Sequence, residues 1–217
     1  MQVVPIDRKT AHKVVRAKHY RKTLGIFWEG FALVEFGMVI GVVTYGQPSA
    51  PIQKHSFADR NFRLYELSRL VVDDDVENGA SYLIANSLKR LSVRPSAVIS
   101  YADSSLGHCG IVYQATNWLY TGAVTAHDKL YKVGGELLHP TTVRDRYGVT
   151  KPVQWAKENG IEMVRPQPKH RYFYLLGSRA QKKEMLSKLK YPLISGYPKC
   201  NKSKYTSPST CQEVLNT

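Results

Sequence analysis

The sequence predicts an α/β fold built on one mixed sheet. Two apolar stretches, residues 65–72 and 97–101, flank a segment of helical periodicity, which is the pattern of two parallel strands joined by a crossover helix. Residues 31–36 and 38–45 are also apolar and are separated only by Gly37, and so short a connection joins antiparallel strands. Parallel and antiparallel pairs together indicate a mixed sheet.

The N-terminal elements follow from local patterns. Residues 2–6 form a short apolar strand, and Asp7 can cap a helix over residues 10–19. The exposed face of this helix carries the cations Lys9, Lys13, Arg16 and Lys18. Residues 47–61 are polar and contain two prolines, so we expect a long loop before the first parallel strand.

The parallel unit supplies the first functional candidate. Its helix opens at Asn78, and a turn over residues 104–110 leads from its second strand to a short helix that carries Tyr113. Asp103 stands at the carboxyl end of that second strand. Because ligands of parallel sheets bind at the carboxyl ends of the strands, we expect a site at Asp103.

The C-terminal half contains two more strands around a polar insertion. The strands cover residues 118–124 and 169–176, and glycine pairs within the insertion, residues 125–168, argue against one continuous helix. A basic helix over residues 179–190 follows, and we expect poor order in the Pro-, Ser- and Lys-rich sequence after it.

The chain shows no internal repeat and no second hydrophobic core, so we expect a single domain, residues 1–177, with a basic C-terminal appendage, residues 178–217. The 31 Lys and Arg against 17 Asp and Glu give a formal charge of +14, and eleven of these cations lie within residues 165–204 beside one acidic residue. Such an excess favours a nucleic-acid partner. A membrane partner is disfavoured because no apolar run approaches the ~20 residues of a spanning helix.

Cysteine usage favours a reducing compartment. The three cysteines, Cys109, Cys200 and Cys211, are too few and too scattered for a disulfide framework, and residues 1–8 lack the apolar core of a signal peptide. We therefore expect a cytoplasmic protein. His108 beside Cys109 is more often a turn next to a buried thiol than a nucleophile or metal pair.

The order of elements resembles that of the GNAT acyltransferase fold. Five motifs in this order also resemble the phage Mom family: His19-Tyr20, Tyr65-Glu66-Leu67-Ser68-Arg69-Leu70-Val71-Val72, Ser100-Tyr101-Ala102-Asp103, Tyr113, and Lys169-His170-Arg171-Tyr172. The resemblance runs from about residue 4 to about residue 176. It implies conversion of adenine in DNA to N6-carbamoylmethyladenine, which blocks host restriction, in the cytoplasm of the infected cell.

The resemblance implies roles for particular residues. The catalytic set would be Asp103, Tyr113, His19, Tyr20 and Arg69. The distribution of positive charge, and not the resemblance, suggests the nucleic-acid-binding set Arg144, Arg146, Lys169, Arg171, Lys182 and Lys183. Duplex DNA would be the substrate, and the base would have to be flipped out of the duplex because its amine is stacked inside.

The donor is less directly implied. Asn78, Gly79, Ala80 and Ser81 align with the loop that holds acetyl-CoA in GNAT enzymes, but the basic or amide residue of that loop is missing. Asp73, Asp74, Asp75 and Glu77 stand close by, and carboxylates beside a diphosphate cost Coulomb energy. An activated glycine such as glycyl-tRNA is therefore the expected donor, with acetyl-CoA as the alternative.

Simpler interpretations of these residues stay open. Asp103 could be a turn residue, Tyr113 a core residue, and His19 a favourable cation at a helix end. A buried Arg69 needs a partner, which could be Asp103, Glu66 or a substrate anion. The set His19, Tyr20, Asp103 and Tyr113 would suit iron better than zinc, so iron is a possible cofactor, but no spacing requires a metal and we assign no metal ligands.

Two other function classes compete with DNA modification. One is an N-acetyltransferase that uses acetyl-CoA on a small amine. The other is a non-catalytic, basic nucleic-acid-binding protein on a GNAT core. Inward polar residues at strand ends favour an enzyme, because a pure binding module does not need them there.

Overall fold

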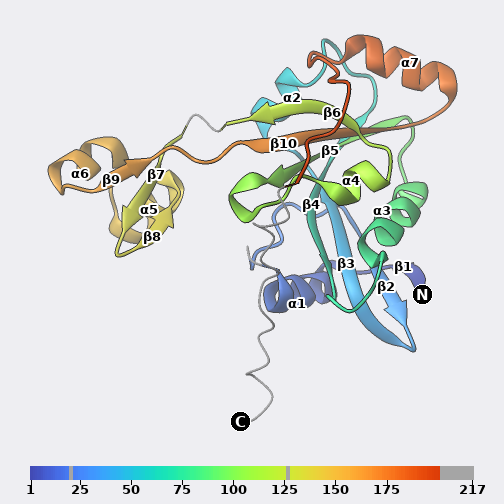
Figure 1. Cartoon of the computed structure of the whole chain (residues 1–217), viewed down its shortest axis with the longest axis horizontal. Coiled ribbons are helices and arrows are strands. Elements are labelled where there is room, and N and C mark those ends of the chain that lie inside the picture. The colour runs from blue at the N-terminus through green and yellow to red at the C-terminus, as the bar shows by residue number, and fades with distance from the viewer. Residues whose placement is uncertain (20–21, 126–127, 201–217) are drawn as a thin grey trace. The chain divides into compact units, whose positions relative to one another are not determined.

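The computed structural model describes residues 1–19, 22–125 and 128–200 and confirms the mixed α/β fold (Figure 1). The chain divides into two compact units. The first contains Met1–Tyr101, Gly110–Gly122 and Arg171–Pro198, and the described residues of the second are Ala102–Cys109, the chain between Ala123 and His170, and residues 199–200.

A seven-stranded sheet organises the first unit, in the order β1-β2-β3-β4-β5-β10-β6. The strands are β1 (Gln2–Pro5), β2 (Glu29–Glu35), β3 (Met38–Gly46), β4 (Arg63–Val72), β5 (Ser96–Asp103), β6 (Leu119–Val124) and β10 (Lys169–Leu176). Strands β1 to β4 pair antiparallel, and β4 pairs parallel with β5. The element order is the one expected of a GNAT-like core.

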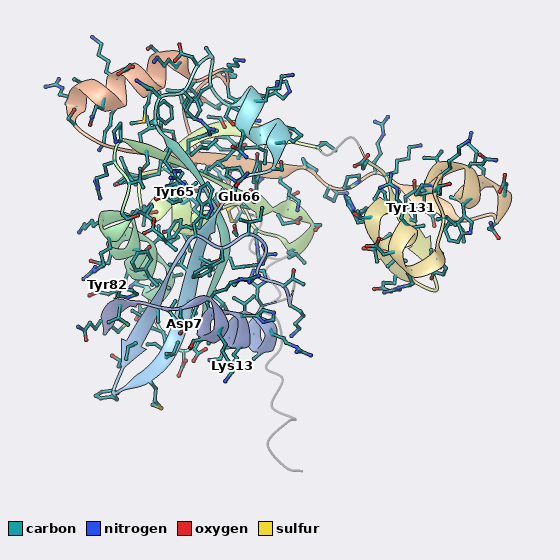
Figure 2. The ribbon with its side chains drawn as sticks, turned by 180° about the vertical axis from the view of Figure 1, so that it is seen from behind. Asp7, Lys13, Tyr65, Glu66, Tyr82 and Tyr131 are labelled. Atoms are coloured by element: carbon teal, nitrogen blue, oxygen red, sulfur yellow. A yellow bond between two sulfur atoms is a disulfide. The ribbon has the colours of Figure 1, made fainter. Side chains whose placement is uncertain are left out.

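The helices of this unit are α1 (Arg8–Lys18), α2 (Ala50–His55), α3 (Gly79–Arg90), α4 (Ile111–Ala115) and α7 (Arg179–Lys188). Asp7 caps α1 as expected, since its carboxylate accepts hydrogen bonds from Lys9 N (2.8 Å) and Thr10 N (3.0 Å). Lys13 lies on the exposed side of α1 (Figure 2). Helix α2 corrects the expectation of a loop over residues 47–61; its proline lies in the first turn, where a missing N–H costs nothing.

The parallel pair β4–β5 is short and then opens. Its register runs from Arg63↔Ser96 to Glu66↔Ile99. Just beyond, the Ser100 hydroxyl donates to the carbonyl of Leu67 across 3.1 Å. A side chain thus replaces backbone pairing where the strands part, and this position carries two of the motifs from the sequence.

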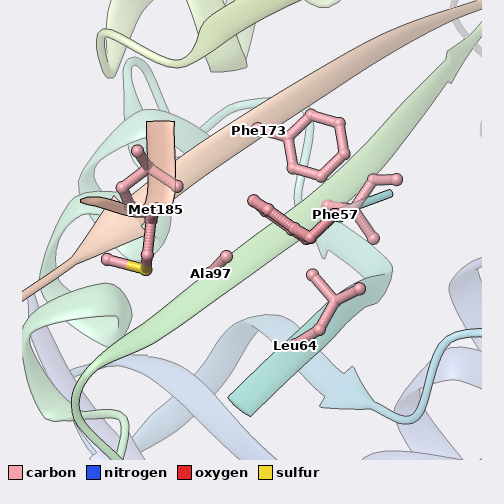
Figure 3. Close-up of a cluster of buried hydrophobic side chains, with 7 residues drawn as sticks. Phe57, Leu64, Ala97, Phe173 and Met185 are labelled. Atoms are coloured by element: carbon pink, nitrogen blue, oxygen red, sulfur yellow. The ribbon is translucent and has the colours of Figure 1, made fainter. Parts of the chain in front are cut away.

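The C-terminal helix belongs to the core. Figure 3 shows Met185 from α7 converging on Phe57, Leu64, Ala97 and Phe173. Met185 is only 1% exposed. Farther along, Tyr197 donates its hydroxyl hydrogen to Trp118 O (2.7 Å). Met185 and Tyr197 thus attach the C-terminal segment to the first unit, although most of residues 179–198 are exposed; residues 201–217 lie outside the described part.

We expect Phe173→Ala to lower the free energy of unfolding by about 3–5 kcal/mol, because it empties a fully buried aromatic site. Phe36→Ala is the matched control. Phe36 is 93% exposed at the β2–β3 turn, so its loss should change stability by less than about 0.5 kcal/mol. Urea unfolding followed by circular dichroism measures both, and equal effects would contradict the packing in Figure 3.

The second unit has a sheet of its own, in the order β8-β7-β9. Its elements are β7 (Leu130–Val133), β8 (Glu136–Leu138), β9 (Glu162–Val164), the 3-10 turn Ser104–Leu106, α5 (Pro140–Tyr147) and α6 (Pro152–Glu158). Tyr131 (Figure 2), Leu138, Val143 and Ala156 form a hydrophobic core. The expectation of no second core was wrong, because each short element contributes only one or two apolar residues.

Cys109 and Cys200 form a disulfide, with Cα atoms 5.4 Å apart. This corrects the expectation of unpaired cysteines. The two residues are 91 positions apart in sequence, so only the fold brings them together. Cys211 lies outside the described residues. Within the described part, no helix is both long enough and apolar enough to cross a membrane.

Candidate active site

Asp103 ends β5 and is tied down on both sides. Its Oδ1 accepts hydrogen bonds from Ser105 N (3.1 Å) and Ser105 Oγ (2.6 Å), and its Oδ2 lies 2.8 Å from Lys169 Nζ. The side chain of Asp103 is 14% exposed. The adjacent Ser104 hydroxyl donates to Pro168 O, which holds the turn against the start of β10. Asp103 is thus both the turn residue of the simpler interpretation and a positioned, ion-paired carboxylate.

The surroundings keep Asp103 ionised. Burial acts to raise the pKa of this carboxyl, but the hydrogen bonds and charge of Lys169 and the bonds from Ser105 outweigh it and lower the pKa. A carboxylate with a lowered pKa is a weak proton acceptor and a strong hydrogen-bond acceptor. It can orient an N–H group or balance a developing positive charge.

His108 is a second titratable group of this turn that sequence reasoning set aside. Its backbone N–H donates to Asp103 O (3.2 Å). Burial lowers the pKa of the imidazole, and the nearby charge of Asp103 opposes that shift without cancelling it. An imidazole with a pKa below the usual ~6.5 is neutral at pH 7 and can accept a proton. The sequence signal that could have identified His108 as a functional residue was its position in the turn after Asp103, three residues before the predicted helix.

Tyr113 is buried in the first unit and bonded through its hydroxyl. Its Oη lies 2.8 Å from Ser100 Oγ, which in turn donates to Leu67 O where β4 and β5 part. Its ring contacts Trp118 and Tyr172 at centroid distances of 4.9 and 5.1 Å. Tyr113 is therefore a core residue whose hydroxyl is hydrogen-bonded to Ser100, and its catalytic role stays a prediction.

Gly110 lets α4, and with it Tyr113, lie against β10. Its φ of +83° is left-handed, and a Cβ there would come within 2.5 Å of the Tyr172 ring. The close approach of this helix start is thus built on a position that only glycine fills without strain.

Arg69 fixes the chain that follows α1. Its guanidinium donates to Thr23 O and Ser68 O, both at 2.5 Å, and to Thr23 Oγ1 at 3.4 Å. These bonds go to two backbone carbonyls and one hydroxyl, and the carboxylate or substrate anion that the sequence suggested as a partner of Arg69 stays a prediction. His19 is the C-cap residue of α1, and its backbone N–H bonds Val15 O. Tyr20 lies outside the described residues.

The loop expected to hold the donor is internally bonded. Gly79 N donates to Val76 O (3.1 Å), and the Ser81 hydroxyl donates to Asn78 O (2.9 Å). A Cβ at Gly79 would lie 2.6 Å from the Val76 side chain, so this glycine serves close packing within the loop. Of the neighbouring acids, Asp73 pairs with Lys18, and Asp74, Asp75 and Glu77 are exposed.

The expected nucleic-acid residues have different environments. Arg144, Lys182 and Lys183 are exposed, and Arg146 pairs with Glu136 at 2.7 Å. Lys169 binds Asp103. Arg171 is 8% exposed, donates to Thr121, and stacks on Tyr191 with 3.3 Å to the ring centroid. Arg171 therefore does not fit the DNA-binding surface that the sequence suggested, because it is buried against Tyr191 and exposes almost none of its side chain.

The described residues contain no group of three or more His, Cys, Asp or Glu side chains that could hold a metal ion. The proposed iron set also includes Tyr20, which lies outside the described part, and Tyr113, whose hydroxyl bonds Ser100. The structure gives no support to an iron site.

Comparison with known proteins gives a family match. The sequence model of the Mom protein family matches residues 1–193. The "Methylcarbamoylase mom" of Escherichia phage Mu is 27% identical over 208 residues, which cover 92% of this chain and 84% of that protein. Among solved structures, aminoglycoside 6'-acetyltransferase type Ii (11% identity, TM-score 0.46) covers 81% of this chain and 97% of its own. A spermidine N-acetyltransferase SpeG mutant from Vibrio cholerae (10% identity, TM-score 0.47) aligns with 81% of this chain and 95% of its own chain.

Proposed function

The chain belongs to the Mom protein family, and from that premise we propose that it is a transferase that converts adenine in DNA to N6-carbamoylmethyladenine. The observation that carries the proposal is the turn after β5. Asp103 is held ionised there by Lys169 and Ser105, and His108, with a lowered pKa, stands five residues later. Such a pair of titratable groups is typical of a catalytic site and has no evident use in a binding module.

The two groups divide the proton work. The N6 amine of adenine is a poor nucleophile and must lose a proton as it forms a new bond. Asp103, whose pKa is lowered, accepts a hydrogen bond from N6 and orients it, while the neutral imidazole of His108 takes the proton.

The donor loop favours a donor other than acetyl-CoA. An anion at a helix start is held by backbone N–H groups, but Gly79 N is already bonded to Val76 O, and exposed carboxylates surround the loop. A pyrophosphate at this place would meet repulsion from Asp74, Asp75 and Glu77. An ordinary N-acetyltransferase therefore fits the chain less well.

The product's atoms are consistent with an activated glycine. In the first step N6 attacks the ester carbonyl of glycyl-tRNA, the N6–C bond forms, and the terminal hydroxyl of the tRNA leaves. In the second step the free glycyl amine attacks C6 and closes a five-membered ring. Cleavage of the bond between C6 and the original N6 then leaves carbamoylmethyl on C6 through the glycine nitrogen, with the original N6 as the terminal amide. No oxidant or reductant is needed.

The proposed function is tested by expressing the chain in a bacterium and analysing its DNA nucleosides by mass spectrometry. A carbamoylmethyl deoxyadenosine should appear with the wild-type chain and be absent with Asp103→Asn. Unmodified DNA from cells that hold folded wild-type protein would reject the proposal.

Isotope labelling tests the donor. With purified protein, DNA and tRNA charged with ¹⁵N-glycine, we expect the label in the nitrogen bonded to C6, because that nitrogen comes from glycine in the rearrangement. Fragmentation of the modified nucleoside separates this nitrogen from the terminal amide. Label in the amide, or product formed from acetyl-CoA without tRNA, would contradict the glycyl route while leaving adenine modification intact.

A further inference from the structure

A basic pocket lies at the amino ends of the parallel strands in the first unit. Arg63 begins β4 and Pro95 directly precedes β5, and ligands of parallel sheets bind at the other, carboxyl ends. The pocket has a volume of about 490 Å³. Besides these two residues it is lined by Trp28, Gln47, Gln53, Arg60, Asn61, Phe62, Leu64, Val93 and Arg94. None of the functional assignments above uses it.

The pocket collects positive charge without an acidic residue. Three arginines line it, and no Asp or Glu does. Within the described residues, Arg60, Arg63 and Arg94 form no ion pair. Burial and the charge of Arg63 both lower the pKa of Arg60, so the two guanidinium groups repel each other. This arrangement costs free energy until an anion enters.

The nearby acids are engaged elsewhere. Glu29 follows Trp28 in sequence, but its carboxylate accepts hydrogen bonds from Tyr65 Oη (2.6 Å), Ser92 N (3.1 Å) and Ser92 Oγ (2.8 Å). Asp59 precedes Arg60 and pairs with Lys188 at 2.8 Å. Neither carboxylate neutralises the pocket.

Two of the arginines are oriented in advance. The Arg63 guanidinium carbon lies 4.7 Å from the centroid of the Trp28 ring, and Trp28 packs edge-to-face against Tyr65 at 5.6 Å. Arg60 donates to Gln53 Oε1 at 3.3 Å. A planar group stacked on an indole keeps its N–H edge available for an anion. Arg94 has a structural task, because it donates to Leu88 O and Lys89 O at the end of α3.

We propose that this pocket binds one nucleotide unit of an unpaired nucleic-acid strand. Arg60 and Arg63 hold the phosphate, since the guanidinium fork matches two phosphate oxygens. The exposed amides of Gln47 and Asn61 supply donors and acceptors for a base edge, and Phe62 supplies an apolar wall for the base. This inference rests on the proposed function in one respect, namely that nucleic acid is the substrate class. A DNA strand beside the flipped base and the acceptor end of a tRNA both offer an unpaired nucleotide with a phosphate and a free base edge.

The test compares the double variant Arg60→Ala/Arg63→Ala with a charge-matched control, Arg16→Ala/Arg90→Ala, whose two arginines are exposed and outside the pocket. Fluorescence anisotropy measures binding of short single-stranded DNA and RNA oligonucleotides at several salt concentrations. We expect the pocket variant to bind at least one of them about tenfold more weakly, and its log–log salt slope to fall by about 0.7 for one lost phosphate contact. The control should keep the wild-type slope.

A photocrosslink locates the contact. An oligonucleotide with 5-iodouracil should crosslink to peptides that contain Trp28 or Phe62, and inorganic phosphate should compete with it. Tighter binding of DNA identifies a DNA strand as the source, and tighter binding of RNA identifies the tRNA end. Equal losses in the two variants, or crosslinks only outside the lining residues, would overturn the proposal.

Binding is measured here without turnover, so the pocket and the proposed function can fail independently. If the pocket variant loses binding but no adenine product ever forms, the pocket stands and the DNA-modifying function falls. Thermal unfolding of each variant establishes that it is folded, which the exposure of all four arginines leads us to expect.

Discussion

Asp103→Asn should lower adenine modification by about 10²–10⁴-fold while it leaves DNA affinity nearly unchanged. Asparagine keeps the size of the side chain and can still accept the bonds from Ser105, but it carries no charge to orient N6–H or to pair with Lys169. Single-turnover kinetics on duplex DNA, followed by nucleoside mass spectrometry, measures the rate.

The matched control is Asp145→Asn, an exposed aspartate of the same unit. It should retain the wild-type rate. A rate for Asp103→Asn within about threefold of the control would remove Asp103 from the site, and loss of DNA binding together with rate would assign it to substrate binding in place of catalysis.

Lys169→Met should lower the rate by about tenfold or more at neutral pH and shift the acidic limb of the pH–rate profile to higher pH. The ammonium group of Lys169 helps to lower the pKa of Asp103, so its loss lets burial raise that pKa and protonates the carboxylate earlier as the pH falls. Rates measured across the acidic range for wild type, Lys169→Met and the exposed control Lys151→Met test this expectation.

The same pair predicts a pH dependence of stability. A carboxyl whose pKa is lowered by folding stabilises the protein above its unfolded pKa of ~3.9, and this contribution is lost as the pH falls through the folded pKa. Lys169→Met should therefore cost roughly 1–2 kcal/mol near neutrality, since the pair is only partly buried, and less in acid. The cost should be smaller in an Asp103→Asn background; equal costs in both backgrounds would mean that Lys169 acts on another group.

The structure also changes how the C-terminal segment should be probed. A deletion after Gly177 is the simplest way to ask whether the basic C-terminal segment binds DNA, but its result would be ambiguous. It would remove Met185, which is 1% exposed in the core beside Phe173, and would expose apolar surface. Loss of DNA binding in that deletion would report unfolding. Charge reversal at exposed Lys182 and Lys183 tests the same surface and leaves the packing intact.

The sequence by itself determined the elements whose signals are local. Apolar and aromatic runs located the strands later seen as β4, β5 and β10, and the oxygen-bearing side chain of Asp7 indicated the N-cap of α1. The same patterns placed Asp103 at the end of its strand. Such signals lie within a few residues of the structure they specify. A short element such as α2 escaped them, because six residues give too few turns for a periodic pattern.

Only the tertiary structure decided which distant residues meet. Lys169 was expected to bind DNA, but the fold places its ammonium on Asp103, 66 positions earlier, and the same strand turns Arg171 inward onto Tyr191. Cys109 and Cys200 meet across 91 positions, and the pocket joins Trp28 to the arginines before β4. The physical reason is that a side chain's charge and bonding follow from its neighbours in space. Sequence patterns specify the face of a strand or helix on which a residue lies, but they do not specify which distant residues will contact it.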